Sequence, residues 1–437
     1  MNKDIVCKFG GTSLASSENI RKVRDIVLAG NKRFVVVSAP GKRNKEDTKI
    51  TDCLIDCFTK SKNNEDFLDS FEFFKNRFEG IKKDLGVEID LEPYYQELLE
   101  WINSQKSYDY VVSRGEFFSA KIISLYFGYE FLDASSFITF ANDGTVELNS
   151  TKQKFLSLIK PNTNYVIPGF YGIDYKGKIK TFTRGGSDVS GAILSTIANA
   201  KVYENWTDVD GFLVADPRLC DNPSLIKELS YQELRELSYM GANVLHQDCV
   251  RFLRENNVIL NLRNTFNPTC EGSLIMPDKH KIKHQKLTGI AGQKGFTIIH
   301  IEKFAVNESL GIIEKIANIL KKYHISVEHI PTSIDSISVI VKSHFINSTN
   351  LKDITEDINA EIKPDNLKII ESVSLISVVG SILRSDVKIE SRVFESIYKT
   401  GAEIITLNKG AGGISIIFGV YEKDFDKTIK TLYSSLF

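Results

Sequence analysis

Short apolar runs alternate with amphipathic stretches from the start of the chain to about residue 285. Apolar runs bounded by turn residues predict buried strands, and apolar positions that return every three or four residues predict helices. Strands and helices in alternation are typical of a three-layer α/β domain with an open sheet. The predicted strands are 5–9, 34–38, 110–113, 165–168, 179–183, 202–205 and 258–262. The predicted helices include 19–28, 65–78, 115–126 and 189–198.

A shorter pattern begins after the stretch 278–286, which is rich in Lys and His and is predicted to be an exposed linker. Strand, helix, strand, strand and helix follow in that order from residue 297, and the same order returns from residue 374. The first of these helices, 309–323, has one apolar and one charged face, so it is expected to lie on a sheet. The repeated order predicts two small α+β modules. The predicted domains are 1–286, 287–372 and 373–437.

Composition narrows the class of partner. The 437 residues include 55 Lys and Arg against 56 Asp and Glu, a balance that offers no net field for nucleic acid or an anionic membrane. A small-molecule partner is therefore expected. The six cysteines have no spacing typical of a disulfide framework or a zinc site, and we interpret them as reduced thiols in a cytoplasm. Neither a signal peptide nor an apolar run of membrane-spanning length is visible.

Two glycine turns carry the first candidate chemistry. The segment 8–13, Lys-Phe-Gly-Gly-Thr-Ser, leaves a strand through adjacent glycines that let backbone N–H groups face an anion, next to a lysine. It has no Walker A spacing, and a plain tight turn is the alternative. The segment 183–188 adds Arg184, which suits a bidentate carboxylate, Ser187 with its hydroxyl, and Asp188 for an ammonium group. A helix cap explains one of these residues but not the arginine and both glycines.

Further candidate segments are less specific. The segment 207–211, followed by 216–218, comes directly after a predicted strand, where nucleotide contacts fit, although a surface loop with turn-forming residues is an equal alternative. The segments 38–41 and 113–116 are expected at strand ends, and helix capping is a sufficient alternative for each. The charged stretch 42–47 is interpreted either as a mobile loop beside the substrate or as a solvated loop without a role.

These segments, in this order, resemble the aspartate kinase branch of the amino-acid kinase family over nearly the whole chain. The resemblance implies transfer of the γ-phosphoryl group of ATP, with Mg²⁺, to the β-carboxylate of L-aspartate. The product that the resemblance implies is 4-phospho-L-aspartate, and the implied reaction is the first step toward lysine, threonine and methionine. The catalytic residues that it implies are Lys8, Glu116 and Asp188. The implied aspartate-binding residues are Ser38, Thr51, Glu116, Phe170, Arg184, Ser187 and Asp188. The implied nucleotide-binding residues are Lys8, Gly10, Gly11, Ser13, Thr207, Asp208, Arg218 and Asn243.

Two positions depart from the family pattern. Leu213 stands where some members have a tyrosine, and Asn243 stands where many have a lysine, which removes a cation expected near the phosphates. Two alternatives therefore stay open. One is a kinase for glutamate, carbamate or a nucleotide, and the other is a catalytically silent amino-acid sensor.

The two C-terminal modules resemble ACT domains, which bind end-product amino acids in this family. The resemblance implies lysine as an effector, with threonine as a second candidate, and a homodimer or dimer of dimers. The N-terminal N–H groups of the helix after residue 308 suit an effector carboxylate. The expected effector residues are Val306, Ser309, Gly311, Ile312, Glu328, Thr332, Ser333 and Asp335. Modules that only dimerise are the alternative.

Overall fold

The computed structural model describes residues 5–183, 185–241, 245, 247–277, 287–410 and 412–437. The described residues fall into two compact units. The first comprises Met1–Phe212, Lys227–Tyr231 and Val244–Ile282, and the second comprises Leu213–Ile226, Gln232–Asn243 and Lys283–Phe437. The predicted linker 278–286 lies outside the described residues, so the boundary at 286/287 stays a prediction.

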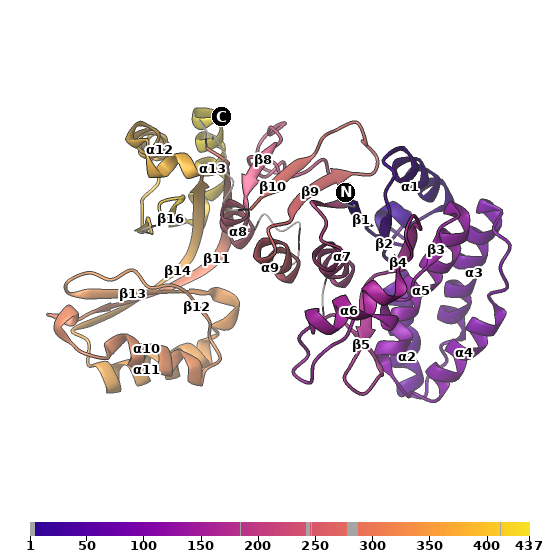
Figure 1. Ribbon diagram of the computed structural model, residues 1–437. Helices are drawn as coiled ribbons and strands as arrows, with labels where there is room; N and C mark the ends of the chain where they lie inside the picture. The colour runs from indigo at the N-terminus through magenta and orange to yellow at the C-terminus, as the bar shows by residue number, and fades with distance from the viewer. Residues whose placement is uncertain (1–4, 184, 242–244, 246, 278–286, 411) are drawn as a thin grey trace. The chain divides into compact units, whose positions relative to one another are not determined.

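The described part of the first unit contains an eight-stranded sheet in the order β3-β4-β2-β1-β7-β9-β10-β8 (Figure 1). All its neighbouring strands are parallel except β9 and β10. Because β1 lies between β2 and β7, the segments that follow these three strands meet at one edge of the sheet. The strands are β1 (Ile5–Phe9), β2 (Phe34–Val37), β3 (Glu130–Phe131), β4 (Tyr165–Pro168), β7 (Val202–Thr207), β8 (Glu228–Ser230), β9 (Ile259–Asn264) and β10 (Ser273–Met276). A separate antiparallel pair consists of β5 (Tyr171–Ile173) and β6 (Ile179–Thr181).

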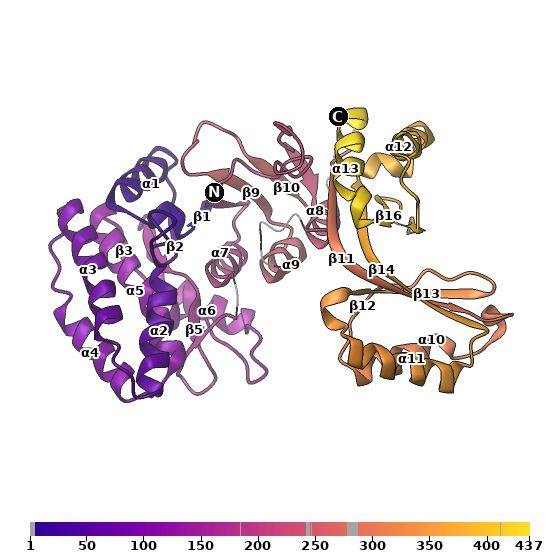
Figure 2. The same cartoon turned by 180° about the vertical axis from the view of Figure 1, so that it is seen from behind.

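Helices cover both faces of this sheet, as Figures 1 and 2 show for α3, α5 and α7. Successive side chains of a strand point to opposite faces. Cys7 and Phe9 therefore join the core beneath α1 to α5, whereas the hydroxyl of Tyr203 on β7 reaches the backbone of α7. The helices are α1 (Ser17–Ala29), α2 (Ile50–Lys62), α3 (Leu68–Leu85), α4 (Glu92–Asn103), α5 (Tyr108–Phe127), α6 (Leu148–Leu158), α7 (Gly186–Ile197) and α9 (Gln247–Glu255). The helix α8 (Tyr231–Tyr239) belongs to the second unit except for its first residue. Among the described residues, no helix has both the length and the apolar character needed to cross a bilayer.

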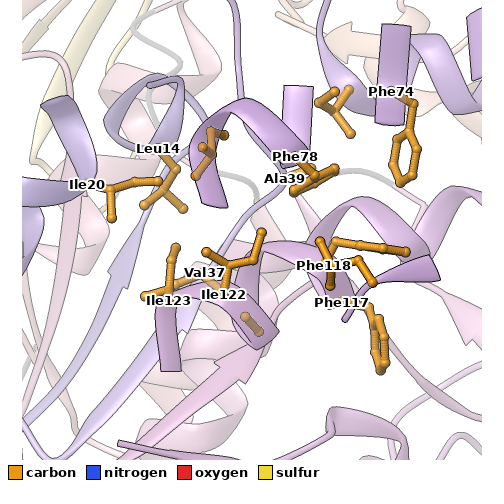
Figure 3. Close-up of a cluster of buried hydrophobic side chains, with 14 of the residues drawn as sticks. Leu14, Ile20, Val37, Ala39, Phe74, Phe78, Phe117, Phe118, Ile122 and Ile123 are labelled. Atoms are coloured by element: carbon orange, nitrogen blue, oxygen red, sulfur yellow. The ribbon is translucent and has the colours of Figure 1, made fainter. Parts of the chain in front are cut away.

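The core beneath α1 to α5 is rich in aromatic rings (Figure 3). Phe74 makes edge-on contacts with Phe78 and Phe118, with ring centroids 5.0 and 5.2 Å apart. Such pairs add to the stabilisation that comes from apolar burial alone. Ala39, in the segment that follows β2, belongs to the same core. The packed core thus extends to the edge of the sheet where the glycine turns lie.

The predicted strand at 110–113 is wrong. These residues lie in the first turns of α5, where the Ser107 hydroxyl caps the helix by accepting a hydrogen bond from Tyr110 N at 3.2 Å. Since α5 is buried on nearly every side, its Val-Val pair carries no periodicity that separates a helix from a strand. Glu116 consequently lies inside a helix rather than after a strand. The other predicted strands of this unit are confirmed to within two residues at each end.

The described part of the second unit contains a six-stranded antiparallel sheet in the order β12-β13-β11-β14-β16-β15. The chain order β11-α10-β12-β13-α11 returns as β14-α12-β15-β16-α13, which confirms the predicted repeat. The strands are β11 (Gly289–Glu302), β12 (Val327–His329), β13 (Ser336–Lys342), β14 (Asn366–Val379), β15 (Thr406–Asn408) and β16 (Ser415–Tyr421). The helices are α10 (Ile312–Lys322), α11 (Ser348–Ile362), α12 (Val387–Thr400) and α13 (Glu422–Leu436).

The two modules share their longest strands. The end of β11 pairs with β13 and with the start of β14, whereas the start of β11 pairs with the end of β14, which itself pairs with β16. Each long strand therefore passes through both halves of the sheet. Separate apolar cores lie under α10 and α11 and under α12 and α13. The boundary predicted at 372/373 falls inside β14 and stays a prediction.

Candidate active site

A cavity of about 640 Å³ lies where the segments after β1, β2 and β4 meet the start of α7. Its volume is in the range of small-molecule sites. The predicted site residues that line it are Lys8, Gly11, Ser38, Thr51, Glu116, Phe170, Ser187 and Asp188. Residues from six separate segments of the chain are thus brought to one place. Arg184 lies outside the described residues.

The Lys8 ammonium, at the cavity wall, is held by two partners. Its Nζ atom lies 2.6 Å from Asp188 Oδ1 and 3.4 Å from Asn205 Oδ1, and the lysine side chain is only 9% exposed. Asn205 Nδ2 also donates to Asp188 Oδ1 at 2.9 Å. Asn205 stands opposite Lys8 across the parallel pair β1 and β7, so the strand register sets this contact. The three side chains fix the position of one cation.

Asn205 was not predicted as a site residue. The signal in the sequence is an amide side chain inside the run 202–206, which otherwise reads as a half-buried strand. A polar side chain that is almost fully buried requires a partner. Which partner it finds depends on the order of the strands, and local sequence does not contain that information.

The turn after β1, which contains Gly11, touches the turn after β2, which contains Gly41, at the rim of the cavity. Gly41 N donates to Gly11 O at 2.8 Å, and a Cβ atom at Gly41 would lie 2.7 Å from Gly11 C. No side chain fits between these backbones, so glycine is required at position 41. A third glycine, Gly185, takes a left-handed φ of 56° directly before α7. The turns therefore present backbone and lysine side chains to the cavity with little shielding.

Glu116 is a buried acid in the cavity wall. It is 5% exposed, and its Oε2 atom has no hydrogen-bond partner among the described residues. Burial raises the pKa of its carboxyl to about 8. At pH 7 the carboxyl of the free protein is therefore mostly protonated. A ligand cation placed beside it would favour the ionised form, so this side chain is suited to pair with an ammonium group.

The remaining predicted nucleotide residues lie elsewhere. Ser13 is buried and its hydroxyl is 2.8 Å from Thr265 Oγ1, and neither Ser13 nor Gly10 lines the cavity. Thr207 bonds its neighbour Asp208, with 3.2 Å between Oγ1 and Oδ1. In the second unit, the exposed Arg218 pairs with Asp216, 2.6 Å between Nη2 and Oδ2. Asn243 lies outside the described residues, whereas Leu213 forms a bridge with Leu225.

The charged loop 42–47 is not simply solvated. Its Asp47 side chain is 4% exposed and forms an ion pair with Arg77 of α3, 2.6 Å between Oδ2 and Nη2. The same carboxylate accepts hydrogen bonds from the backbone and the guanidinium of Arg43. The interpretation of this stretch as a mobile or solvated loop is therefore wrong at Asp47, because the partner lies 30 residues further along the chain.

The predicted effector residues of the first module fall on two adjoining loops and one strand. Asp335 Oδ1 accepts from Ala305 N at 2.7 Å, and Asn307 N donates to Ile334 O at 3.3 Å, so the loop before α10 lies against the loop before β13. Glu328 on β12 accepts a hydrogen bond from the Tyr239 hydroxyl. The residues on the two loops are Val306, Ser309, Gly311, Thr332, Ser333 and Asp335, and Ile312 begins α10.

Comparisons with known proteins decide the family. A model described as the amino acid kinase family matches residues 3–262, and one described as the ACT domain matches residues 376–436. Aspartokinase 3 of Bacillus subtilis (strain 168) is 32% identical over 447 residues, which cover 99% of this chain and 98% of the relative. The chain belongs to the aspartate kinase family. This confirms the resemblance seen in the motifs, and the protein is a phosphotransferase.

Solved structures of aspartate kinases have the same architecture. The crystal structure of Clostridium acetobutylicum aspartate kinase is 38% identical, covers 100% of both chains and has a TM-score of 0.92. Escherichia coli aspartokinase III is 21% identical in two states. Its complex with aspartate and ADP covers 99% of this chain and 100% of that one with a TM-score of 0.75. Its complex with lysine and aspartate covers 99% of each chain with a TM-score of 0.76. At 21% identity, the two E. coli structures show the shared fold alone.

Replacing Asn205 by leucine is expected to lower the kcat of this aspartate kinase about tenfold, because Lys8 loses an acceptor and Asp188 a donor, an effect of about 1.4 kcal/mol. Leucine has the same branched arrangement of side-chain heavy atoms as asparagine, so the shape of the side chain is largely kept. Steady-state kinetics measure the effect, with Asn164→Leu on the exposed loop before β4 as the matched control. An unchanged kcat in Asn205→Leu contradicts the role of this amide.

Proposed function

We propose that this protein transfers the γ-phosphoryl group of MgATP to the β-carboxylate of L-aspartate, giving 4-phospho-L-aspartate. The observation that carries the proposal is the cavity in which the Lys8 ammonium, held by Asp188, faces the same space as Glu116 and Ser187. A cation for phosphate, an acid for an ammonium and hydroxyls for a carboxylate are the groups that this pair of substrates needs. The complex of E. coli aspartokinase III with aspartate and ADP supports the pairing. Such a product would open the route to lysine, threonine and methionine.

The acceptor needs no general base. An ordinary carboxylate has a pKa of about 4, so the β-carboxylate of aspartate is ionised at neutral pH and attacks the γ-phosphorus directly. Catalysis then depends on in-line positioning and on neutralising charge on the phosphoryl oxygens. Lys8, fixed by Asp188 and Asn205, supplies a preorganised cation at that position. A lysine held in place in a buried site loses little energy to reorganisation during transfer.

The cavity is proposed to take the phosphates of ATP and their metal ion. Among the described residues, Lys8, Lys42 and Lys49 bring cations to the cavity for the phosphates. A Cβ atom at Gly11 would lie 3.0 Å from Ala39 O, so the backbone of this turn packs too closely on the turn after β2 to carry a side chain. Magnesium in kinases is held by phosphate oxygens and one or two carboxylates, and Asp188 is the carboxylate that would serve. When bound, Mg²⁺ lowers the negative charge on the phosphates.

The aspartate pocket is proposed to use three kinds of contact. Glu116 would pair with the α-ammonium group, since a cation beside it favours its ionised form. Ser38, Thr51 and Ser187 would offer hydroxyl groups. Arg184 would grip the α-carboxylate with two parallel hydrogen bonds. Phe170, which has a left-handed φ of 78°, would close one side of the pocket.

ATP-dependent hydroxamate formation from aspartate, with Mg²⁺, tests the function, and ADP release measures turnover with acceptors that give no acyl phosphate. Glutamate, carbamate and a nucleoside monophosphate serve as competing acceptors at the same concentration. We expect turnover with aspartate at least about 100-fold above that with glutamate, because the added methylene displaces the reacting carboxylate from its line of attack. Preference for another acceptor would replace the proposed substrate. Effector binding without any turnover would indicate a silent sensor.

The second unit is proposed to bind an amino-acid effector, lysine first and threonine second, and to assemble the protein as a homodimer or a dimer of dimers. The loops that meet through Asp335 and Ala305 would form one wall, and Glu328, whose carboxylate lies 3.9 Å from the Lys342 ammonium, would offer an acceptor for the effector's ammonium group. The ACT match and the complex of E. coli aspartokinase III with lysine support this proposal. Exposed apolar side chains at Phe304, Leu310 and Ile334 suit a contact between subunits.

Replacing Glu328 by glutamine is expected to raise the lysine concentration for half-maximal inhibition at least about tenfold, since a hydrogen bond to a charged group contributes about 1.5–3 kcal/mol. The change keeps the shape of the side chain and an acceptor for Tyr239. Inhibition curves at fixed aspartate and ATP measure it. Glu361→Gln, exposed at the end of α11, is the control in the same module. An unaltered inhibition curve removes Glu328 from the effector site.

A further inference from the structure

Arg77 of α3 lies behind the cavity and contacts three chain segments that form its wall. Its side chain is 3% exposed and is not among the residues that line the cavity. Nη1 donates to Gly41 O at 3.2 Å and to Ala15 O at 3.4 Å, whereas Nη2 lies 2.7 and 2.6 Å from the two oxygens of Asp47. One planar guanidinium therefore joins the turn after β1, the turn after β2 and the loop before α2.

Each of these segments carries residues of the proposed phosphate site. The turn after β1 carries Gly11 and Thr12, which line the cavity a few residues before Ala15. The turn after β2 carries Gly41 and Lys42, which also line the cavity, and the loop that contains Asp47 follows them. The turns are in direct backbone contact, since Gly41 N donates to Gly11 O at 2.8 Å. A shift of one turn consequently moves the other. Reaction rates in such a site fall steeply when the phosphate or its cations are misplaced by about 1 Å.

The ion pair with Asp47 holds the guanidinium of Arg77 in a fixed orientation. Burial by itself raises the pKa of the Asp47 carboxyl, but hydrogen bonds from Arg43 and the charge of Arg77 outweigh burial and hold that pKa below its usual value. The carboxylate thus stays ionised at neutral pH. Because Asp47 accepts from Arg43 N at 2.8 Å as well, the loop that carries Lys42 closes on the same ion pair.

We infer that Arg77 is a positioning residue for phosphoryl transfer. It sets the distance between the turn that contains Gly11 and the turn that contains Gly41, which hold the phosphates, and it touches neither substrate. The inference rests on the proposed function of the cavity. It goes further because it proposes that α3, a helix outside the site, fixes how the turns at Gly11 and Gly41 lie relative to each other. Only an arginine has the planar set of donors that reaches two carbonyl groups and both oxygens of a carboxylate at once.

The first test is Arg77→Lys, which keeps the charge and a contact with Asp47 but cannot reach both carbonyl groups. We expect kcat per folded enzyme to fall at least about tenfold, with the KM for aspartate changed less than threefold, because Glu116, Phe170 and Ser187 of the proposed aspartate pocket lie on other segments. Arg33→Lys is the matched control. Arg33 also donates to two backbone carbonyls, Thr163 O at 3.1 Å and Lys160 O at 2.9 Å, and it does not line the cavity.

A second variant separates positioning from folding. The double change Arg77→Met with Asp47→Leu leaves no unpaired buried charge between these two positions, so the fold is expected to survive. It should show the same loss of kcat with cooperative thermal unfolding retained. Wild-type kcat in both variants overturns the inference, and so does loss of the folded state in both, since Arg77 would then serve folding alone. An inactive wild-type protein would instead overturn the proposed function.

Discussion

Replacing Lys8 by methionine should reduce the kcat of the aspartate kinase reaction on the order of 100-fold or more, by analogy with the loss of a preorganised donor. The KM for aspartate should change less than threefold. The lysine is buried beside Asp188 and Asn205, which fix the position of its charge. The aspartate carboxylate and the ATP phosphates are both anions. During the transfer, negative charge changes at the phosphoryl oxygens, and a fixed cation there stabilises the transition state. Methionine keeps the length and apolar stem of the side chain and removes only the charge.

Coupled measurement of ADP release over a range of aspartate concentrations gives kcat and KM separately. Lys22→Met is the control, because Lys22 is an exposed lysine of α1 that pairs with Glu18 and does not line the cavity. A thermal melt shows that each variant is folded. Equal turnover in Lys8→Met and the wild type would remove Lys8 from catalysis and leave Asp188 without its partner in the mechanism.

Replacing Glu116 by glutamine should change how the stability of the first unit depends on pH. The pKa of Glu116 is about 8 in the folded protein and near 4.5 in an unfolded chain. Below about pH 4.5 the carboxyl is protonated in both states and carries no cost. As the pH rises, the unfolded chain releases the proton first, so the wild type loses stability progressively until the folded carboxyl also ionises near pH 8. Glutamine cannot ionise and avoids this loss.

The difference amounts to several kcal/mol, on the order of 1.4 kcal/mol per pKa unit. Melting curves between pH 5 and pH 9 should therefore diverge, with the Glu116→Gln protein gaining on the order of 10 °C over the wild type at the alkaline end. Glu100→Gln, on the exposed side of α4, supplies the control. Parallel curves for Glu116→Gln and the wild type would show that the carboxyl does not titrate near pH 8. The same variant should bind aspartate less tightly, since it lacks the negative charge for the ammonium group.

Patterns within short stretches predicted much of the fold. Strands 5–9 and 165–168 coincide with β1 and β4, because apolar runs between turn residues have few other solutions. The repeat after residue 287 was visible for the same reason, since each module repeats one order of elements. The strand predicted at 110–113 failed because a helix buried all round has no polar face to reveal its period. Where burial is one-sided, periodicity is informative, and in the deepest core it is not.

The candidate site divides in the same way. The motifs 8–13 and 183–188 identified Lys8, Ser187 and Asp188 from residue types that suit phosphate and carboxylate binding. Neither Asn205 nor Arg77 stands in such a motif. Asn205 meets Lys8 across 197 positions of sequence, and Arg77 meets Ala15 across 62. Contacts of this kind depend on strand order and helix packing, which many distant residues decide together.

By itself, then, the sequence determined the alternation of strands and helices, the repeated modules and the glycine turns with their charged neighbours. These follow from local sterics and from the side of each element that must avoid water. Only the tertiary structure decided that Glu116 sits within a helix, that β11 and β14 run through both modules, that Asn205 holds Lys8, and that Arg77 supports the cavity wall from behind. The physical reason is that burial, and the pairing that buried polar groups require, are properties of the assembled chain.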